Sequence, residues 1–326
     1  MTSEKQISEA VARLFDGIQF PSEPAGLYDP LRYMIEIGGK RIRPTLCMIA
    51  YSLFKDEIGD EILEPAAALE VFHSFTLLHD DIMDKSPLRR GKPTVWTKWN
   101  EDTAILSGDV MQIDAYKRIA KAPVDKLEYT MNIFSKTAAE VCEGQQYDME
   151  FESVPEVSMA DYEKMIGLKT AVLLACSAAI GARIGGASDA QCRMLYNYGY
   201  ELGMAFQVAD DYLDAFGDEK VFGKPIGGDI LNEKKSWLTV RAMEKTSDKE
   251  AFIKAFAAKA DTPEEKAAKI ALFKKIYVDL GVDKDAKAEI VRFSRRAMDA
   301  VSEAGLTKLR MMMLKDFADK LVGRAK

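Results

Sequence analysis

The sequence predicts an all-α protein, and three features of the chain support that prediction. Apolar residues such as Val71, Phe75 and Leu78 recur at spacings of three and four, the period of a helix with one buried face. Alternating β-branched runs closed by Asn-Gly or Asp-Gly, which mark strands, are absent. Proline and glycine gather in a few stretches, which are residues 21–26, 87–93, 155 and 217–228. We expect roughly ten to twelve helices in a single domain over residues 1–326.

The composition indicates a protein with a large core and a charged surface. Hydrophobic residues make up 48% and charged residues 30% of the 326 positions. The formal net charge of −7 argues against nucleic acid as the main partner. An anionic ligand would still require local clusters of Lys and Arg, so the positions of these residues decide what the chain can bind.

The cysteines and the apolar runs indicate in which cellular compartment the protein is expected. Cys47, Cys142, Cys176 and Cys192 lie far apart with no C-x-x-C pair, as expected for small apolar residues in a reducing compartment. The N-terminal residues have mixed charges and no apolar stretch typical of a signal peptide. The longest weakly polar run, residues 171–182, is too short to cross a bilayer. We therefore expect a cytoplasmic protein with no membrane span.

Two copies of a D-D-x-x-D motif stand at the ends of apolar-periodic helices. Residues four apart share a helix face, where two like charges repel, so a cation should offset the first and last Asp of each motif. Carboxylates without nearby His or Cys favour a hard cation, and Mg²⁺ binds a few carboxylates together with water and phosphate oxygens. The predicted metal-binding residues are Asp80, Asp81, Asp84, Asp210 and Asp214.

Basic residues follow each acidic motif. Arg89 and Arg90 come after the first motif, and Lys224 and Lys234 come after the second. A further basic segment, residues 38–44, reads G-G-K-R-I-R-P and lacks the spacing of a P-loop. The planar fork of Arg matches phosphate oxygens, and Lys supplies a point charge. These positions predict binding of a phosphorylated ligand between metal ions and basic side chains.

Together the motifs resemble the trans-polyprenyl diphosphate synthases. The match consists of G-G-K-x-x-R-P from Gly38, H-x₆-D-D-x-x-D-x₄-R-R-G from His73, K-T at Lys169 and Q-x-x-D-D-x-x-D from Gln207, in the family's order. The resemblance implies the isoprenoid synthase fold, a bundle of helices around a central cavity, and a homodimer. It also implies Mg²⁺-dependent condensation of isopentenyl diphosphate with an allylic diphosphate (dimethylallyl, geranyl or farnesyl), with release of diphosphate.

The resemblance also implies a role for each matching position. Asp80 and Asp84 would hold two Mg²⁺ ions and Asp210 a third. The residues that contact the allylic substrate would be Arg89, Lys169, Thr170, Gln207, Lys224 and Lys234. The residues that bind isopentenyl diphosphate would be Lys40, Arg43, His73 and Arg90. Among these, the catalytic group would be Lys169, Thr170 and Gln207, the last two presenting oxygen dipoles to the allylic cation.

Helical spacing supports His73 independently, because it lies seven residues before Asp80 on one stripe of the same helix. Without the surrounding motifs, a lone His on an amphipathic helix would be interpreted as a core residue. His79 adjoins the acidic pair but points elsewhere on the helix, so we expect it to be structural.

Three aromatic or small residues bear on product length. Phe75 lies five residues before the first Asp, Phe72 lies one turn deeper, and Thr76 is small. In the family a bulky residue at the position of Phe75 blocks the growing chain. We expect a short product, geranylgeranyl diphosphate (20 carbons) ahead of farnesyl diphosphate (15 carbons). The alternative is that Phe75 only packs in the core.

Three other functions compete with this interpretation. A terpene cyclase shares the fold, but usually replaces the second acidic motif and lacks counterparts of Lys40, Arg43 and Arg90. A non-catalytic subunit of a heteromeric synthase would be marked by loss of one acidic motif, and both are intact here. A di-iron bundle could use Glu70-x-x-His73, but it needs a second such motif, and His79 does not supply one.

Overall fold

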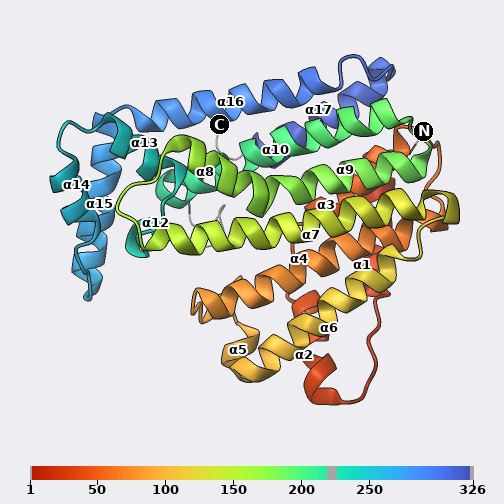
Figure 1. Ribbon diagram of the computed structural model, residues 1–326, viewed down its shortest axis with the longest axis horizontal. Helices are drawn as coiled ribbons and strands as arrows, with labels where there is room; N and C mark the ends of the chain where they lie inside the picture. The colour runs from red at the N-terminus through yellow and green to blue at the C-terminus, as the bar shows by residue number, and fades with distance from the viewer. Residues whose placement is uncertain (1, 219–225, 324–326) are drawn as a thin grey trace. The chain divides into compact units, whose positions relative to one another are not determined.

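Helices make up most of the chain, as the periodicity predicts (Figure 1). The structure is a computed structural model that describes residues 2–218 and 226–323. The chain forms two compact units. Unit 1 comprises Met1–Lys136, Cys176–Tyr196 and Ala304–Met313, and unit 2 comprises Thr137–Ala175, Asn197–Glu303 and Leu314–Lys326. The single domain over residues 1–326 therefore stays a prediction.

Unit 1 carries the first acidic motif on a long buried helix. Its elements are α1 (Glu4–Asp16), α2 (Ala25–Glu36), α3 (Ile42–Ser52), the 3₁₀ turn η1 (Asp60–Ile62), α4 (Leu63–Met83), α5 (Val95–Lys98), α6 (Glu101–Ile119), and parts of α7 (Val124–Glu152), α9 (Val172–Gly185), α10 (Asp189–Phe216) and α17 (Lys308–Val322). Helix α4 packs along α6 and against α3. Leu69, Val71 and Phe72 are fully buried. Helix α9 approaches α3 closely because Gly181 has no side chain: a Cβ there would lie 2.0 Å from the carbonyl oxygen of Cys47.

A short hairpin follows α4 and was not predicted from the sequence. Strands β1 (Leu88–Arg89) and β2 (Lys92–Pro93) pair antiparallel, with Leu88 opposite Pro93. The two turn residues, Arg90 and Gly91, both have positive φ, 53° and 74°, as in the tight two-residue turns of hairpins. Strands of two residues are too short to show alternation, so no strand pattern could be read there.

Unit 2 carries the second acidic motif. Besides its parts of α7, α9, α10 and α17, it contains α8 (Met159–Ile166), the π-helical turn η2 (Gly167–Ala171), α12 (Gly228–Leu231), α13 (Trp237–Lys245), α14 (Lys249–Phe256), α15 (Pro263–Asp279) and α16 (Val282–Ala300). Helices α13 and α15 both pack on α16. Phe252, Phe256 and Phe273 form an aromatic cluster between α14 and α15, with ring centroids 5.1–6.1 Å apart.

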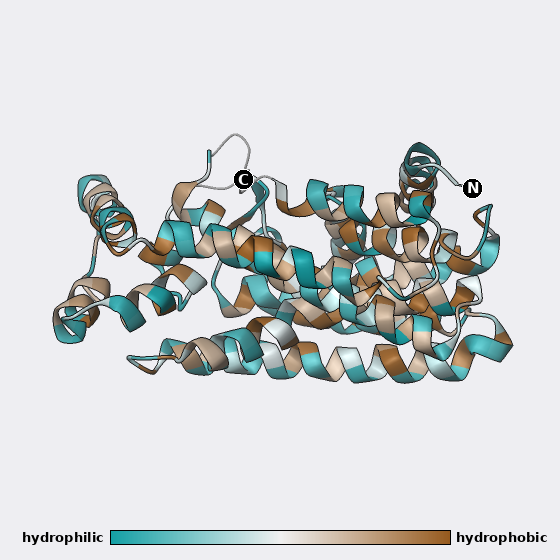
Figure 2. Ribbon diagram, turned by 90° about the horizontal axis from the view of Figure 1, so that it is seen from above, coloured by the Kyte–Doolittle hydropathy of each residue, from teal (hydrophilic) through white to brown (hydrophobic). Residues whose placement is uncertain are grey.

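The described residues contain sixteen α-helical segments, more than the ten to twelve expected. The excess comes from segments too short for a sequence period to reveal, such as α5 and α12, which have four residues each. Hydrophobic and hydrophilic residues are interleaved along the helices (Figure 2). The helical stretch Met159–Gly185 is long and apolar enough to cross a membrane by length and composition alone, and 83% of its most apolar window is buried inside the protein.

Candidate active site

The first acidic motif occupies the C-terminal end of α4. Asp84 caps the helix, and its backbone N–H donates to the carbonyl oxygen of Asp80 at 2.8 Å. Lys85 then adopts a left-handed conformation with φ of 52°, which ends the helix. Asp80 is half-buried and Asp84 is exposed, whereas Asp81 between them is only 1% exposed. The three carboxylates of this motif therefore occupy different environments.

Arg89 on β1 binds the buried member of the motif. Its Nε donates to both carboxylate oxygens of Asp81 at 2.9 Å, and its Nη2 lies 2.8 Å from Asp81 Oδ1 and 3.6 Å from Asp80 Oδ2. Burial opposes the charge on Arg89, but the hydrogen bond to Asp81 and the three Asp charges raise its pKa. Burial raises the pKa of Asp81, although Arg89 counteracts the shift. The hairpin is thus tied to the end of α4.

The oxygen atoms at this helix end suit a hard cation. Asp81 is engaged by Arg89, and His79 directs its Nε2 to the carbonyl oxygen of Ile105 at 3.1 Å, so neither completes a metal cage. In residues 2–218 and 226–323, no three His, Cys, Asp or Glu side chains gather in a way that would hold an ion by themselves. Asp80 and Asp84, one turn apart, fit Mg²⁺, which keeps water and phosphate oxygens among its ligands.

Three arginine side chains and one imidazole also lie in unit 1, and we call Arg41, Arg43, Arg90 and His73 the basic cluster. Arg41 contacts Glu70 (Nη1 to Oε1, 3.2 Å) and donates to the carbonyl oxygen of Ile35 at 2.7 Å. Arg43 is 9% exposed, and its Nε has no hydrogen-bond partner. Burial lowers the pKa of Arg43 to about 10, with Glu70 opposing and Arg90 adding to the shift. All three guanidinium groups have Glu70 as a neighbouring carboxylate, and Asp81 also acts on Arg90, so positive charge is in excess, which favours an anionic ligand.

The two remaining members of the basic cluster depend on their surroundings. Burial, followed by the charges of Arg43 and other arginines, holds the pKa of His73 well below its ordinary value, so this imidazole is neutral at pH 7. The Arg90 guanidinium lies over Gly39, where a Cβ would come 2.6 Å from Nη1. Gly39 therefore leaves room for the Arg90 side chain. Lys40, the next residue, is exposed.

The residues predicted to set product length, Phe72, Phe75 and Thr76, lie on α4, and the two rings belong to a cluster of aromatic side chains. Phe75 is 7% exposed and its ring centroid is 5.4 Å from that of Phe72, which is fully buried. Phe72 in turn contacts Phe134 of α7 at 5.3 Å, and Phe134 contacts Tyr116 of α6 at 5.0 Å. Thr76 donates its hydroxyl to the carbonyl oxygen of His73 at 2.8 Å. Phe75 is therefore the more exposed of the two α4 rings in a series of tilted and edge-to-face aromatic contacts.

The second acidic motif lies at the C-terminal end of α10, and its middle residue is fully engaged. Asp211 Oδ2 accepts hydrogen bonds from the Tyr162 hydroxyl at 2.5 Å and the Trp237 backbone N–H at 2.6 Å, and Oδ1 accepts one from Gln207 at 2.9 Å. Burial raises the pKa of Asp211, although these three hydrogen bonds oppose the shift. Asp211 therefore joins α8, α10 and α13, and Asp81 plays a comparable part in unit 1.

The other two acidic residues of the second motif differ in exposure. Asp210 is half-buried, whereas Asp214 is 8% exposed. Asp214 Oδ2 accepts a hydrogen bond from the backbone N–H of Asp229 at 3.0 Å, and its carbonyl oxygen accepts one from Gly227 at 2.7 Å. Asp214 thus helps to position the start of α12.

Several residues predicted to bind the allylic substrate meet in unit 2. Asp148 on α7 lies 2.7 Å from Lys169 Nζ and 3.6 Å from Lys234 Nζ, and Lys234 also lies 2.6 Å from Glu152. Burial would raise the pKa of Asp148, but the two lysines lower it overall. Thr170 donates to Gln207 Oε1 at 2.9 Å. Lys224 lies outside the described residues.

Lys169 and Thr170 lie on η2, a single π-helical turn, a feature often found at functional sites. Helix α7 approaches this turn closely, since a Cβ at Gly144 would lie 2.2 Å from the backbone nitrogen of Lys169. Arg41 and Asp148 were not predicted as site residues from the sequence, and Glu70 was considered only as part of a di-iron motif. Glu70 could have been noticed from the sequence, because it is a charged residue on an otherwise apolar helix face, three residues before His73.

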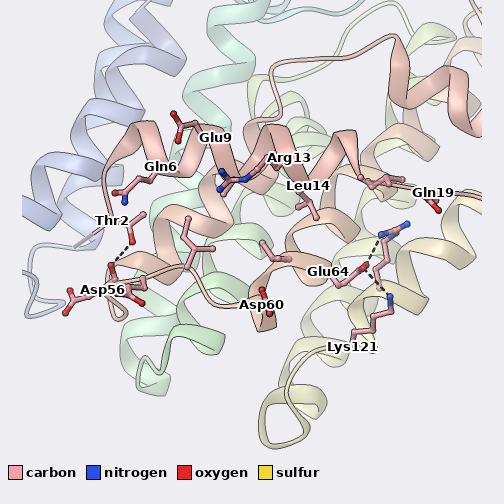
Figure 3. A pocket seen from close by; sticks show the side chains of 17 residues that line it. Thr2, Gln6, Glu9, Arg13, Leu14, Gln19, Asp56, Asp60, Glu64 and Lys121 are labelled. Atoms are coloured by element: carbon pink, nitrogen blue, oxygen red, sulfur yellow. Dashed lines mark hydrogen bonds and ion pairs between the residues drawn. The ribbon is translucent and has the colours of Figure 1, made fainter.

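Unit 1 also contains a cavity of about 860 Å³ that none of the predicted site residues lines (Figure 3). It lies along α1 and is bordered by Asp56, Asp60 and Lys121. Glu64 within it is ion-paired with both Arg118 (2.8 Å) and Lys121 (3.2 Å). Because none of the residues that match the family motifs lines this cavity, we assign it no catalytic role.

Comparison with known proteins identifies the family. The polyprenyl synthetase family profile matches residues 24–274. Geranylgeranyl diphosphate synthase of Methanosarcina mazei is 40% identical over 244 residues, 74% of this chain and 75% of that protein. Geranylfarnesyl diphosphate synthase of Natronomonas pharaonis is 33% identical and covers 100% of both chains. A crystal structure of a geranylgeranyl pyrophosphate synthase has a TM-score of 0.93 at 39% identity, covering 99% of both chains.

The chain therefore belongs to the polyprenyl synthetase family. The predicted all-α isoprenoid synthase fold is confirmed, and so is the prediction that the protein is a trans-prenyltransferase. The family match favours a synthase over the terpene cyclase considered above.

Proposed function

We propose that the protein is a Mg²⁺-dependent trans-prenyltransferase that condenses isopentenyl diphosphate with dimethylallyl, geranyl or farnesyl diphosphate. Its product would be a short trans-prenyl diphosphate, geranylgeranyl ahead of farnesyl. The observation that carries the proposal is the basic cluster, in which a buried Arg43 donor without a hydrogen-bond partner adjoins three other cationic or imidazole side chains. A diphosphate supplies the oxygens that such a cluster lacks.

The metal sites follow from the carboxylates left accessible. Asp80 and Asp84 would hold two Mg²⁺ ions and Asp210 a third, giving three per active site. We reassign Asp81 and Asp214 from metal binding to support, since Asp81 binds Arg89 and Asp214 accepts from the backbone of α12. Bound Mg²⁺ would offset the negative charge that develops on the diphosphate as the allylic C–O bond breaks.

The protein's own side chains would divide the two substrates between them. Lys40, Arg43, His73 and Arg90 would bind isopentenyl diphosphate. Arg89, Lys169, Thr170, Gln207, Lys224 and Lys234 would bind the allylic diphosphate and shield its cation. The double bond of isopentenyl diphosphate attacks the allylic carbon, and the released diphosphate accepts the proton that is lost. No His-centred base is required, because the released diphosphate would take that part.

Incubation of the purified protein with isopentenyl diphosphate, each of the three primers and Mg²⁺ tests this function. We expect prenyl products of 20 carbons, with formation abolished by EDTA and restored by Mg²⁺. Chromatography of the dephosphorylated products also detects 15-carbon or geranylfarnesyl chains. No product with any primer would instead favour a non-catalytic subunit, and full activity in EDTA would rule out the metal.

Separate effects on the two substrates form a first prediction. Lys40→Ala and Arg43→Ala should raise the apparent KM for isopentenyl diphosphate by roughly 10- to 100-fold, the size expected for one charge-assisted hydrogen bond. Lys169→Ala should act mainly on the allylic substrate and on kcat. Lys266→Ala, an exposed lysine on α15, serves as the control. If Lys40→Ala, Arg43→Ala and Lys169→Ala all affected the same substrate equally, the proposed division of the two substrates between these side chains would be contradicted.

We also propose a homodimer in the cytoplasm. Three large apolar side chains on α6, Ile105, Leu106 and Ile113, are 41–58% exposed, and a second copy of the chain would cover them. Light scattering after gel filtration should give twice the mass of the chain. The charged substitution Leu106→Glu should yield monomers, whereas Leu272→Glu, an exposed apolar residue on α15, should not. A monomeric wild type would disprove the dimer.

A further inference from the structure

His79 contacts the residue proposed to limit product length. Its ring lies edge-on to the Phe75 ring, with centroids 4.8 Å apart and planes inclined by 70°. The two residues are four apart on α4 and therefore share a face of the helix. Edge-to-face contacts of this kind hold aromatic rings in defined orientations. His79 is thus in direct contact with Phe75.

The His79 ring is itself held in place by α6. Its Nε2 donates to the carbonyl oxygen of Ile105, 3.1 Å away. Across from the ring lies Gly108, where a Cβ would come 2.1 Å from Nε2 and 2.5 Å from Cδ2. Any side chain at position 108 would therefore displace the imidazole. A hydrogen bond and a closely fitting helix surface together fix the orientation of His79.

The Phe75 ring has a second neighbour on its other side. Phe72 lies one turn earlier, 5.4 Å away between centroids, and is packed against Phe134. Phe75 is thus bounded by a buried aromatic group in one direction and by His79 in the other. Only His79 is anchored to α6 by a hydrogen bond. Removing it would leave the Phe75 side chain free to change rotamer on that side.

We propose that His79 is a positioning residue for product length, which holds the Phe75 ring across the path of the growing prenyl chain. The inference rests on the proposed function, because it requires that the protein makes prenyl chains. It assigns His79 no contact with metal or diphosphate. Its expected effect is therefore on where elongation stops.

The test uses three variants and one matched control. His79→Leu removes the edge-on ring and the hydrogen bond, and the ratio of longer to normal product should rise roughly 2- to 10-fold, the range that corresponds to one aromatic contact. His79→Phe keeps an aromatic edge and should retain the normal product. Gly108→Ala should displace the imidazole and act like His79→Leu. Gly26→Ala, where a Cβ meets open space, should change nothing.

A double variant separates positioning from general loosening. In a Phe75→Ala background, His79→Leu should add no further lengthening, because the ring it positions is gone. Unchanged products from folded, active His79→Leu would overturn the proposal, as would equal lengthening in both backgrounds or folded but inactive His79→Leu. If His79→Leu does not fold, Gly108→Ala decides by the same criteria. Failure of the wild type to condense any substrate would instead refute the proposed function itself.

Discussion

Asp80→Ala, Asp84→Ala and Asp210→Ala should each lower kcat by at least roughly 10²-fold, the loss typical of removing one electrostatic stabiliser of a transition state. These carboxylates are half-buried or exposed, whereas Asp81 and Asp211 are buried and carry the hydrogen bonds to Arg89 and Tyr162. Their removal should therefore change the melting temperature little. Steady-state kinetics with saturating Mg²⁺ measure the first effect, and thermal unfolding measures the second.

Asp316→Ala on α17 is a suitable control, because Asp316 is exposed and lies outside both motifs. Its kinetics should equal those of the wild type. Raising the Mg²⁺ concentration should partly restore Asp84→Ala if this residue contributes metal affinity. A variant that retains wild-type turnover would remove that aspartate from the metal sites. A fall in melting temperature with equal loss of activity would show that the aspartate supports the fold.

Phe75→Ala should lengthen the products while condensation continues. Each further five-carbon unit gains roughly 4 kcal/mol if it is buried, so elongation continues unless the pocket ends, and the Phe75 ring is the proposed end. Some stability should also be lost, since Phe→Ala in a core costs about 3–5 kcal/mol and less where the site is open to a ligand. Chromatography of dephosphorylated products measures chain length.

Phe252→Ala provides the matched control. Phe252 is 4% exposed and packs on Phe273 in unit 2, so this change should lower stability without altering the product. Product lengthening in Phe75→Ala alone supports the steric role. Unchanged product length together with a lower melting temperature would make Phe75 a core residue only, as the alternative interpretation of the sequence holds.

Helical spacing was sufficient to predict the helices that carry the chemistry. The periodic residues around Val71 and Leu78 correctly placed the first acidic motif at the end of a long helix, now α4. Family motifs then assigned residues to roles. Spacing could not predict that Asp81 and Asp211 turn inward, because their hydrogen-bond partners Arg89 and Tyr162 come from other elements.

Other parts of the site depend on tertiary contacts that no local pattern encodes. Asp148 meets Lys169 from 21 positions away, and Arg41 meets Glu70 from 29 positions away. The hairpin was missed because its strands have two residues each. The π-helical turn at Lys169 was missed because one extra residue in a helix leaves the apolar pattern almost unchanged.

Three cationic side chains that we propose for substrate binding form ion pairs with carboxylates of their own unit. Arg89 faces Asp81, while Lys169 and Lys234 face Asp148. These carboxylates act as internal counter-ions, so the positive charges stay folded and oriented before any substrate arrives. A diphosphate must then compete with an ionic contact that exists already, and its affinity reflects the difference between the two contacts. Such exchange gives an enzyme that releases diphosphate after each addition and keeps its cations in place for the next.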